Sequence, residues 1–190
     1  MPRFIAIVGT NASKSYNRVL LNYMKSHFAD QAEIEVQEIK DVPLFNEDAM
    51  TDIPTVIENI DQKILAADGV IFGVPEYDHS VPACLKSLIE WLSSARHSFN
   101  HKPVMIVGGS YGIQGTVRAQ MNLRQILDSP GVNAEVLPGN EFQLANVTQK
   151  LDDNGQLVDE RSAQFLDTCF DNFVDFVRAH EIVSEEKLVK

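Results

Sequence analysis

Residues 4–18 read Phe-Ile-Ala-Ile-Val-Gly-Thr-Asn-Ala-Ser-Lys-Ser-Tyr-Asn-Arg, an apolar run that stops at Gly9 and gives way to a loop rich in hydroxyl and amide groups. In many α/β proteins a strand leads through such a loop into a helix and holds a phosphate. Free backbone amides and the helix dipole both favour an anion at that point. The competing interpretation is that Ser13 or Ser15 only caps the helix.

The loop differs from two other phosphate-binding patterns. Lys14-Ser15 follows a glycine, as in a Walker A loop, but the second glycine is missing and the spacing is one residue short. The Gly-x-Gly-x-x-Gly pattern that binds the pyrophosphate of a dinucleotide is absent as well. The loop therefore favours a terminal monophosphate over a nucleoside triphosphate or a dinucleotide.

The rest of the chain alternates strand-like apolar runs with segments of helical period, which is typical of a parallel sheet covered on both faces. This α/β pattern predicts a flavodoxin-like three-layer sandwich whose five parallel strands have the order 2-1-3-4-5, with helices on both faces. The loops after the first, third and fourth strands then line one ligand site. The expected strands are residues 3–8, 34–39, 69–74, 104–107 and 134–137, and the expected helices are 16–29, 55–67, a helix after Pro82, 116–127 and 159–180.

Composition narrows the class of protein. A length of 190 residues suits one domain, residues 1–190, whose charged end 181–190 is expected to fray. The formal net charge of -11 argues against nucleic acid or an anionic membrane as a partner. Cys84 and Cys169 lack metal-ligand spacing, and the sequence shows neither a signal peptide nor a membrane-length apolar run. We expect a cytoplasmic protein without a metal site.

The loop after the third strand carries the most specific pattern. Residues 75–91 read Pro-Glu-Tyr-Asp-His-Ser-Val-Pro-Ala-Cys-Leu-Lys-Ser-Leu-Ile-Glu-Trp. They resemble the Pro-Glu-Tyr-Asn-x-Ser-x-Pro-x-x-Leu-Lys-x-x-Ile-Asp-Trp signature of the flavodoxin-like NADPH-dependent FMN reductase family, which includes FMN, quinone, azo and chromate reductases. Residues 9–17 and 109–124 resemble that family's Gly-Ser-Leu-Arg-x-x-Ser-x-Asn and Ser-Pro-Gly-x-x-Gly-x-x-Arg-Ala-Gln-x-x-Leu-Arg segments.

The resemblance implies an NAD(P)H-dependent FMN oxidoreductase. NADPH or NADH reduces bound FMN, and a small acceptor such as a flavin, quinone, azo compound or metal oxyanion takes the electrons. No side chain needs to act as an acid or base, and backbone amides near Glu76 and Tyr77 are expected to bond the flavin ring. The implied contacts are Thr10, Ser13, Ser15, Tyr16 and Asn17 around the phosphate, and Pro75, Glu76, Tyr77, Asp78, Ser110, Tyr111 and Gly112 around the ring.

Three positions depart from the family pattern. Ala12 stands where the family has an arginine, so either Lys14 or Arg18 compensates or neutral donors alone hold the phosphate. We expect weaker flavin binding as a result. Asp78 replaces an asparagine, and Tyr111 replaces a proline and either stacks on or gates the ring or is simply exposed.

Two other functions stay open. A flavodoxin-type electron carrier fits the acidic charge but has a Thr-x-Thr-Gly-x-Thr loop that this chain lacks. A non-catalytic FMN-binding protein on the same fold is the other alternative, because a fold does not fix a function. His79 is either a proton donor or a histidine that faces solvent or a dimer contact. The resemblance further implies a homodimer or a dimer of dimers.

Overall fold

The computed structural model describes the backbone of residues 1–188 and the side chains of residues 1–182. Its centre is a parallel sheet in the order β2-β1-β3-β4-β5, with β6 paired to β4, so the predicted strand order 2-1-3-4-5 is confirmed. The strands are β1 (Arg3–Val8), β2 (Glu33–Gln37), β3 (Gly69–Gly73), β4 (Pro103–Gly109), β5 (Glu135–Val136) and β6 (Phe142–Leu144).

The outermost position of the sheet beside β4 is shared by two short strands. β5 pairs with Pro103 and Val104, whereas β6 pairs with the other end of β4, from Val107 to Gly109. Between them lie Pro138, which has no amide to donate to the sheet, and Gly139, which has a φ of +67°. The sequence predicts only the first of these strands, because three residues after a Pro-Gly pair are too few to show a strand period.

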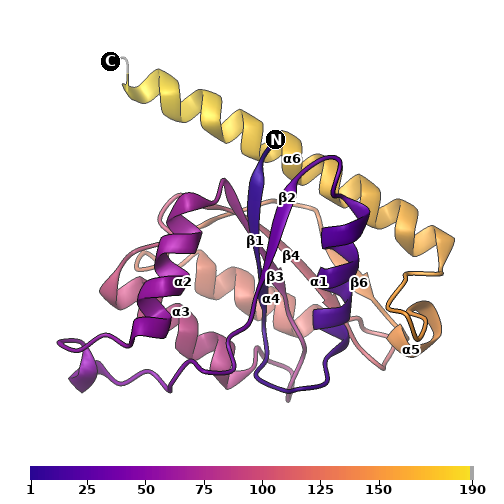
Figure 1. The fold of residues 1–190 in the computed structure, drawn as a ribbon, viewed down its shortest axis with the longest axis horizontal. Coiled ribbons are helices and arrows are strands. Elements are labelled where there is room, and N and C mark those ends of the chain that lie inside the picture. The colour runs from indigo at the N-terminus through magenta and orange to yellow at the C-terminus, as the bar shows by residue number, and fades with distance from the viewer. Residues whose placement is uncertain (189–190) are drawn as a thin grey trace.

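Helices cover both faces of the sheet. In β1, Ile5 and Ile7 point into a core formed with α2, α3 and α4, while Phe4, Ala6 and Val8 point into a core formed with α1 and α6. Figure 1 shows α2 and α3 side by side away from α1. The helical elements are α1 (Tyr16–His27), η1 (Glu47–Ala49), α2 (Thr55–Ala66), α3 (Ala83–Ala95), α4 (Val117–Leu127), α5 (Val147–Lys150) and α6 (Glu160–Leu188).

The last helix is longer than the sequence pattern predicts. α6 continues to Leu188, past the predicted end near His180, because the segment that follows contains neither glycine nor proline. Part of the tail that we expected to fray, residues 189–190, lies outside the described residues. In Figure 1 this helix passes the N-terminus and then projects beyond it.

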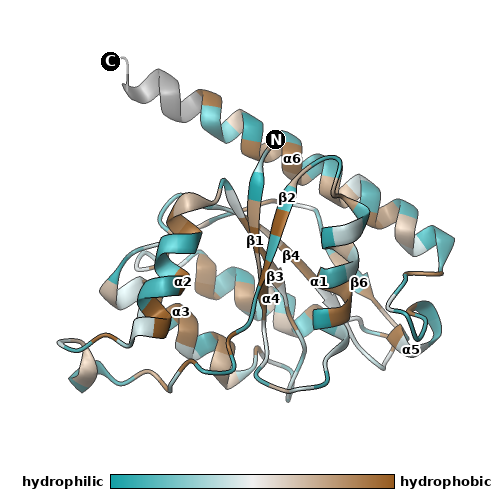
Figure 2. Cartoon of the chain, in the orientation of Figure 1, coloured by the Kyte–Doolittle hydropathy of each residue, from teal (hydrophilic) through white to brown (hydrophobic). Residues whose placement is uncertain are grey.

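Hydropathy follows the layers. In Figure 2 the central strands are mostly brown, whereas each long helix carries brown and teal residues together, as expected for helices with one buried face. Among residues 1–188, no helix is both long enough and apolar enough to cross a membrane.

The carboxyl ends of the three central strands are joined directly. The Gly9 amide donates to the Gly73 carbonyl at 2.9 Å, and the Val74 amide donates to the Val107 carbonyl at 2.9 Å. A Cβ atom at Gly9 would lie 2.7 Å from the Gly73 oxygen, so only glycine permits this approach of the two strands. The loops after β1, β3 and β4 therefore start from one small area.

Candidate functional site

A cavity of about 430 Å³ lies where these three loops meet. Its volume falls in the usual range of small-molecule sites, roughly 300–1,000 Å³. Of the predicted contacts, Thr10, Asp78 and Gly112 are outside its lining. The lining residues are Ser13, Lys14, Ser15, Tyr16, Asn17, Arg18, Val19, Pro75, Glu76, Tyr77, Gly109, Ser110 and Tyr111.

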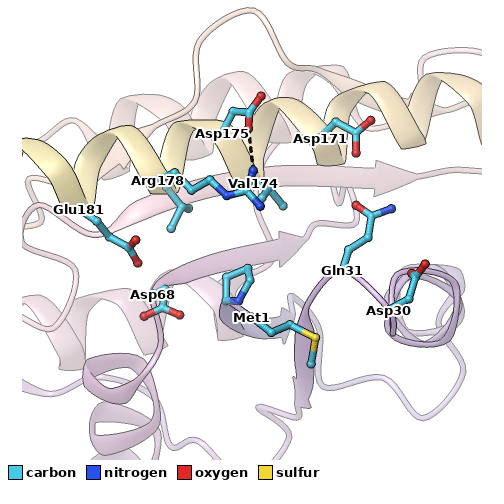
Figure 3. Close-up of a pocket in the computed structure, with 11 residues that line it drawn as sticks. Met1, Asp30, Gln31, Asp68, Asp171, Val174, Asp175, Arg178 and Glu181 are labelled. Atoms are coloured by element: carbon cyan, nitrogen blue, oxygen red, sulfur yellow. Dashed lines mark hydrogen bonds and ion pairs between the residues drawn. The ribbon is translucent and has the colours of Figure 1, made fainter.

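A larger cavity, of about 820 Å³, lies at the opposite end of the sheet between the N-terminus and α6 (Figure 3). Arg178 in its wall is paired with Asp175 at 3.2 Å. The acidic side chains of this wall would repel a phosphate, and none of the three family motifs reaches it. The acidic residues of this wall are Asp30, Asp68, Asp171, Asp175 and Glu181. We therefore take the smaller cavity as the functional site.

The loop after β1 opens α1 through Ser15. The Ser15 hydroxyl accepts a hydrogen bond from the Arg18 amide at 3.3 Å, which makes it the N-cap of the helix. Its own hydrogen remains available for another acceptor. Ser15 thus caps the helix as one interpretation of the sequence predicted, and capping is compatible with an anion site at the same helix end.

Thr10 and Asn17 are fully engaged inside the protein. Thr10 is completely buried, and its hydroxyl lies 2.9 Å from the Tyr77 hydroxyl and accepts from the Ala12 amide at 3.2 Å. The buried Asn17 amide group donates to the Gly109 carbonyl at 3.1 Å and accepts from the Gly109 amide at 2.9 Å. These side chains tie the loop after β1 to the ends of the other two loops.

The two cationic side chains of the loop after β1 that line the cavity, Lys14 and Arg18, differ in their surroundings. The Arg18 guanidinium binds both carboxylate oxygens of Glu38, with Nη2 to Oε2 at 2.7 Å, and also donates to the Ser13 carbonyl at 3.0 Å. The hydrogen bond from Arg18 lowers the pKa of Glu38, and the same bond raises the pKa of Arg18. Lys14 is exposed and makes no hydrogen bond or ion pair within the described residues.

The loop after β3 is a tight hairpin. The Tyr77 amide donates to the Ser80 carbonyl at 3.1 Å, and the Ser80 amide donates back to the Tyr77 carbonyl at 3.0 Å. Asp78 and His79 occupy its tip with φ of 49° and 62°, as a type I′ turn requires. Asp78 is thus a turn residue, a position that aspartate and asparagine both tolerate.

This hairpin narrows the choice of backbone donors for a ligand. The Tyr77 amide is already bonded inside the turn to the Ser80 carbonyl. The Glu76 amide has no hydrogen-bond partner in the part of the chain that the structure describes. Among the residues of this loop that line the cavity, Glu76 is the one whose amide can bond a ligand.

The Glu76 side chain caps α4. Its Oε2 atom accepts from the amides of Arg118 at 2.9 Å and Ala119 at 3.2 Å, and its Oε1 atom lies 3.7 Å from Nη1 of Arg118. Thr116, the residue before the helix, makes no side-chain capping bond. A carboxylate at this helix end also faces the positive end of the helix dipole. Glu76 therefore connects the hairpin to the segment after β4.

The segment after β4 contributes an aromatic residue to the cavity mouth. Tyr111 is 73% exposed, and its ring meets the Tyr16 ring edge-on with centroids 5.3 Å apart. Gly112 and His79 line a neighbouring cavity of about 400 Å³, which shares Glu76 and Ser110 with the first. Both lie beside the candidate site and outside its own wall.

The fold and these loops define the class of protein. A parallel sheet in the order 2-1-3-4-5, with a ligand cavity at the switch point between β1 and β3 where the strand order reverses, is that of a flavodoxin-like protein. The sequence model of a family described as NADPH-dependent FMN reductase matches residues 2–149, and the chain belongs to that family. It is therefore an oxidoreductase that works with FMN and a reduced nicotinamide nucleotide.

Individual relatives agree with this assignment. A Lactobacillus johnsonii protein named NADH-dependent flavin reductase subunit 2 is 48% identical over 92% of this chain and 97% of its own length. A Vibrio ruber protein named NADH:(hydroxy)cinnamate reductase subunit CrdA is 44% identical over 98% of this chain and 93% of its own. The solved structure of FerB, a flavoenzyme NAD(P)H:(acceptor) oxidoreductase from Paracoccus denitrificans, has a TM-score of 0.85 and 26% identity over 95% of this chain and 99% of its own.

Proposed function

We propose that this protein transfers electrons from NADH or NADPH through FMN to a small acceptor, a flavin or a quinone, at the cavity between the three loops. The convergence of all three family motifs on one cavity carries the proposal. Bound FMN supplies the redox chemistry, by taking a hydride from the nicotinamide and passing electrons on. The side chains bind, orient and shield the reactants.

The donor set at one end of the cavity fits a phosphate monoester. The Ser13 and Ser15 hydroxyls, the Lys14 ammonium and the first amides of α1 surround that end. Thr10 and Asn17, which are buried and bonded to other loops, hold the loop in shape. Tyr16 forms a wall beside the helix N-terminus.

The other end fits a flat ring. Pro75, Tyr77 and Ser110 provide walls, and the Glu76 amide provides a donor toward a polar ring edge. A donor at that position stabilises negative charge on the reduced ring. Asp78 contributes by shaping the hairpin that carries Glu76 and Tyr77. Gly112 lines the neighbouring cavity, where the acceptor could approach the ring.

The relatives and the exposed mouth of the cavity support a flavin or a quinone as the acceptor. Named relatives include a 2-hydroxy-1,4-benzoquinone reductase of Burkholderia and a quinone reductase of Escherichia coli. The exposed Tyr111 offers a face on which a planar acceptor stacks. A protein-bound acceptor is a second candidate, because the Lactobacillus and Vibrio relatives are both named as subunits.

We further propose that the chain is one cytoplasmic domain that works as a homodimer or a dimer of dimers. Both hydrophobic cores share a single sheet, which supports one domain. Large apolar side chains on and near the loops of the site are exposed, which supports burial by a second copy. They are Leu44 (76%), Tyr77 (47%), Tyr111 (73%), Ile113 (81%) and Met121 (49%).

The deciding experiment mixes the anaerobic FMN-loaded protein with NADH or NADPH in a stopped-flow spectrophotometer. We expect the visible flavin absorbance to bleach, and turnover to follow with a quinone, an azo dye or free FMN. A flavin that stays oxidised with both nucleotides would refute the reductase function and favour a non-catalytic FMN-binding protein. Bleaching only by a reduced donor protein would favour an electron carrier.

A further inference from the structure

Positive charge at the phosphate end of the cavity is limited. Ala12 supplies none, and the two cationic side chains in the wall are Lys14 and Arg18. The Arg18 side chain is only 20% exposed and is held by Glu38 through two hydrogen bonds, and the Ser13 carbonyl takes a third. Lys14 has no such partner within residues 1–182.

The Arg18–Glu38 pair opposes phosphate binding by Arg18. A fork-to-fork contact satisfies the guanidinium with the same two-point geometry that a phosphate would use. Glu38 occupies the Nε and one Nη2 hydrogen of Arg18, so a phosphate could use that edge of the guanidinium only by displacing the carboxylate. At the remaining donors, the nearby Glu38 carboxylate would repel a phosphate. The pair as a whole brings no net charge to the subsite.

We infer that Lys14 is the side-chain cation of the phosphate subsite and that Glu38 withholds Arg18 from it, so that the protein discriminates between FMN and riboflavin less strongly than it would with Arg18 free. The inference rests on the proposed FMN site. It gives Glu38, which follows β2 and does not line the cavity, the role of a specificity-determining residue that acts through Arg18.

The magnitude follows from the strength of charged hydrogen bonds. One such bond to a phosphate changes affinity by roughly 10- to 100-fold. Riboflavin lacks the phosphate and has the same ring, so its affinity reports the ring end of the cavity alone. The ratio of the two dissociation constants therefore isolates the phosphate subsite.

The test titrates the apo-protein with FMN and with riboflavin and follows quenching of flavin fluorescence. We expect Lys14→Gln to weaken FMN binding roughly tenfold or more and to leave riboflavin unchanged. Glu38→Gln is expected to strengthen FMN binding by roughly three- to tenfold, and Glu38→Ala by at least as much. The double variant Arg18→Gln/Glu38→Gln is expected to lose that gain. Lys25→Gln, at the exposed far end of α1, is the matched charge control.

The outcomes separate this inference from the function it rests on. Failure of both flavins to bind the wild type overturns the proposed FMN site and the inference with it. Binding of both flavins, with an FMN-to-riboflavin ratio that Lys14→Gln or both Glu38 variants leave unchanged, overturns the inference alone. Thermal melts of each apo-variant exclude unfolding as the cause of a weaker FMN interaction.

Discussion

Removal of the Glu76 carboxylate tests how the site is held together. Glu76 accepts two amide hydrogen bonds from the first turn of α4, at 2.9 and 3.2 Å, and its side chain is 14% exposed. Glu76→Ala removes both bonds, whereas Glu76→Gln keeps an acceptor oxygen and removes only the charge. The two variants therefore separate hydrogen bonding from the interactions of the charge with the helix dipole and with the Arg118 guanidinium.

The expected losses of stability differ between the variants. A hydrogen bond to a charged group contributes roughly 1.5–3 kcal/mol, but Arg118 is near the surface, where water replaces part of the lost bonding. We expect Glu76→Ala to lower the free energy of unfolding by about 2 kcal/mol and Glu76→Gln by about 0.5–1 kcal/mol. In a chain of this length the Tm then falls by roughly 4–8 °C and 1–4 °C.

The assay is thermal unfolding of the apo-proteins. Flavin titration and measurement of kcat for the flavin-saturated proteins accompany it. Glu58→Gln is the control, because Glu58 pairs with Arg96 at an exposed position and such pairs contribute roughly 0–1 kcal/mol. We expect kcat of flavin-saturated Glu76→Gln to stay within about twofold of wild type, since a general acid would contribute roughly 100- to 10,000-fold. A Glu76→Ala variant that melts with the wild type, or a Glu76→Gln variant that loses kcat but no stability, would refute the reasoning.

Three further changes have defined outcomes. Ala12→Arg adds the missing cation and is expected to strengthen FMN binding roughly tenfold without affecting riboflavin; equal affinities for FMN in both proteins would contradict this. Burial raises the pKa of the Cys169 thiol to about 11. Iodoacetamide at pH 8 should therefore label the part-exposed Cys84 and spare Cys169 until the protein is unfolded. Mass spectrometry of the peptides measures this difference, and labelling of Cys169 in the folded protein would contradict it. His79→Gly relieves a left-handed residue with a φ of 62° and is expected to raise the Tm by roughly 1–4 °C, and a lower Tm would show that the histidine side chain stabilises the turn.

The sheet could be predicted from the sequence because its information is local. The buried strands β1, β3 and β4 are continuous apolar runs, and each amphipathic helix shows its own period. β6 escaped prediction because its pairing with β4 depends on a loop that returns to the sheet after Pro138 and Gly139. Nothing in a three-residue segment indicates such a return.

The convergence of the three loops was also predictable, but the direction of each side chain was not. Glu76 meets the amides of α4 across 42 and 43 residues of sequence, and Arg18 meets Glu38 across 20. Such pairings arise from tertiary packing and leave no periodic trace in the chain. From residue type alone, Glu76 and Arg18 were expected near a ligand. The fold shows that Glu76 instead bonds the amides of α4 and that Arg18 bonds Glu38.

This distinction changes what the motif residues mean. Thr10, Asn17 and Glu76 stand at motif positions, and in the structure each bonds a different loop of the site. These side chains carry a hydroxyl, an amide and a carboxylate, and their bonds hold the three loops at a fixed spacing. In the proposed site, this spacing separates the phosphate end from the ring end. A substitution that preserves these bonds should therefore preserve the cavity even where it changes charge. Under the proposed roles, Ala12 and Glu38 belong to the opposite kind, since both would act on how strongly the cavity binds and leave its shape intact. Affinity for the flavin would then vary in this chain independently of the geometry that positions it.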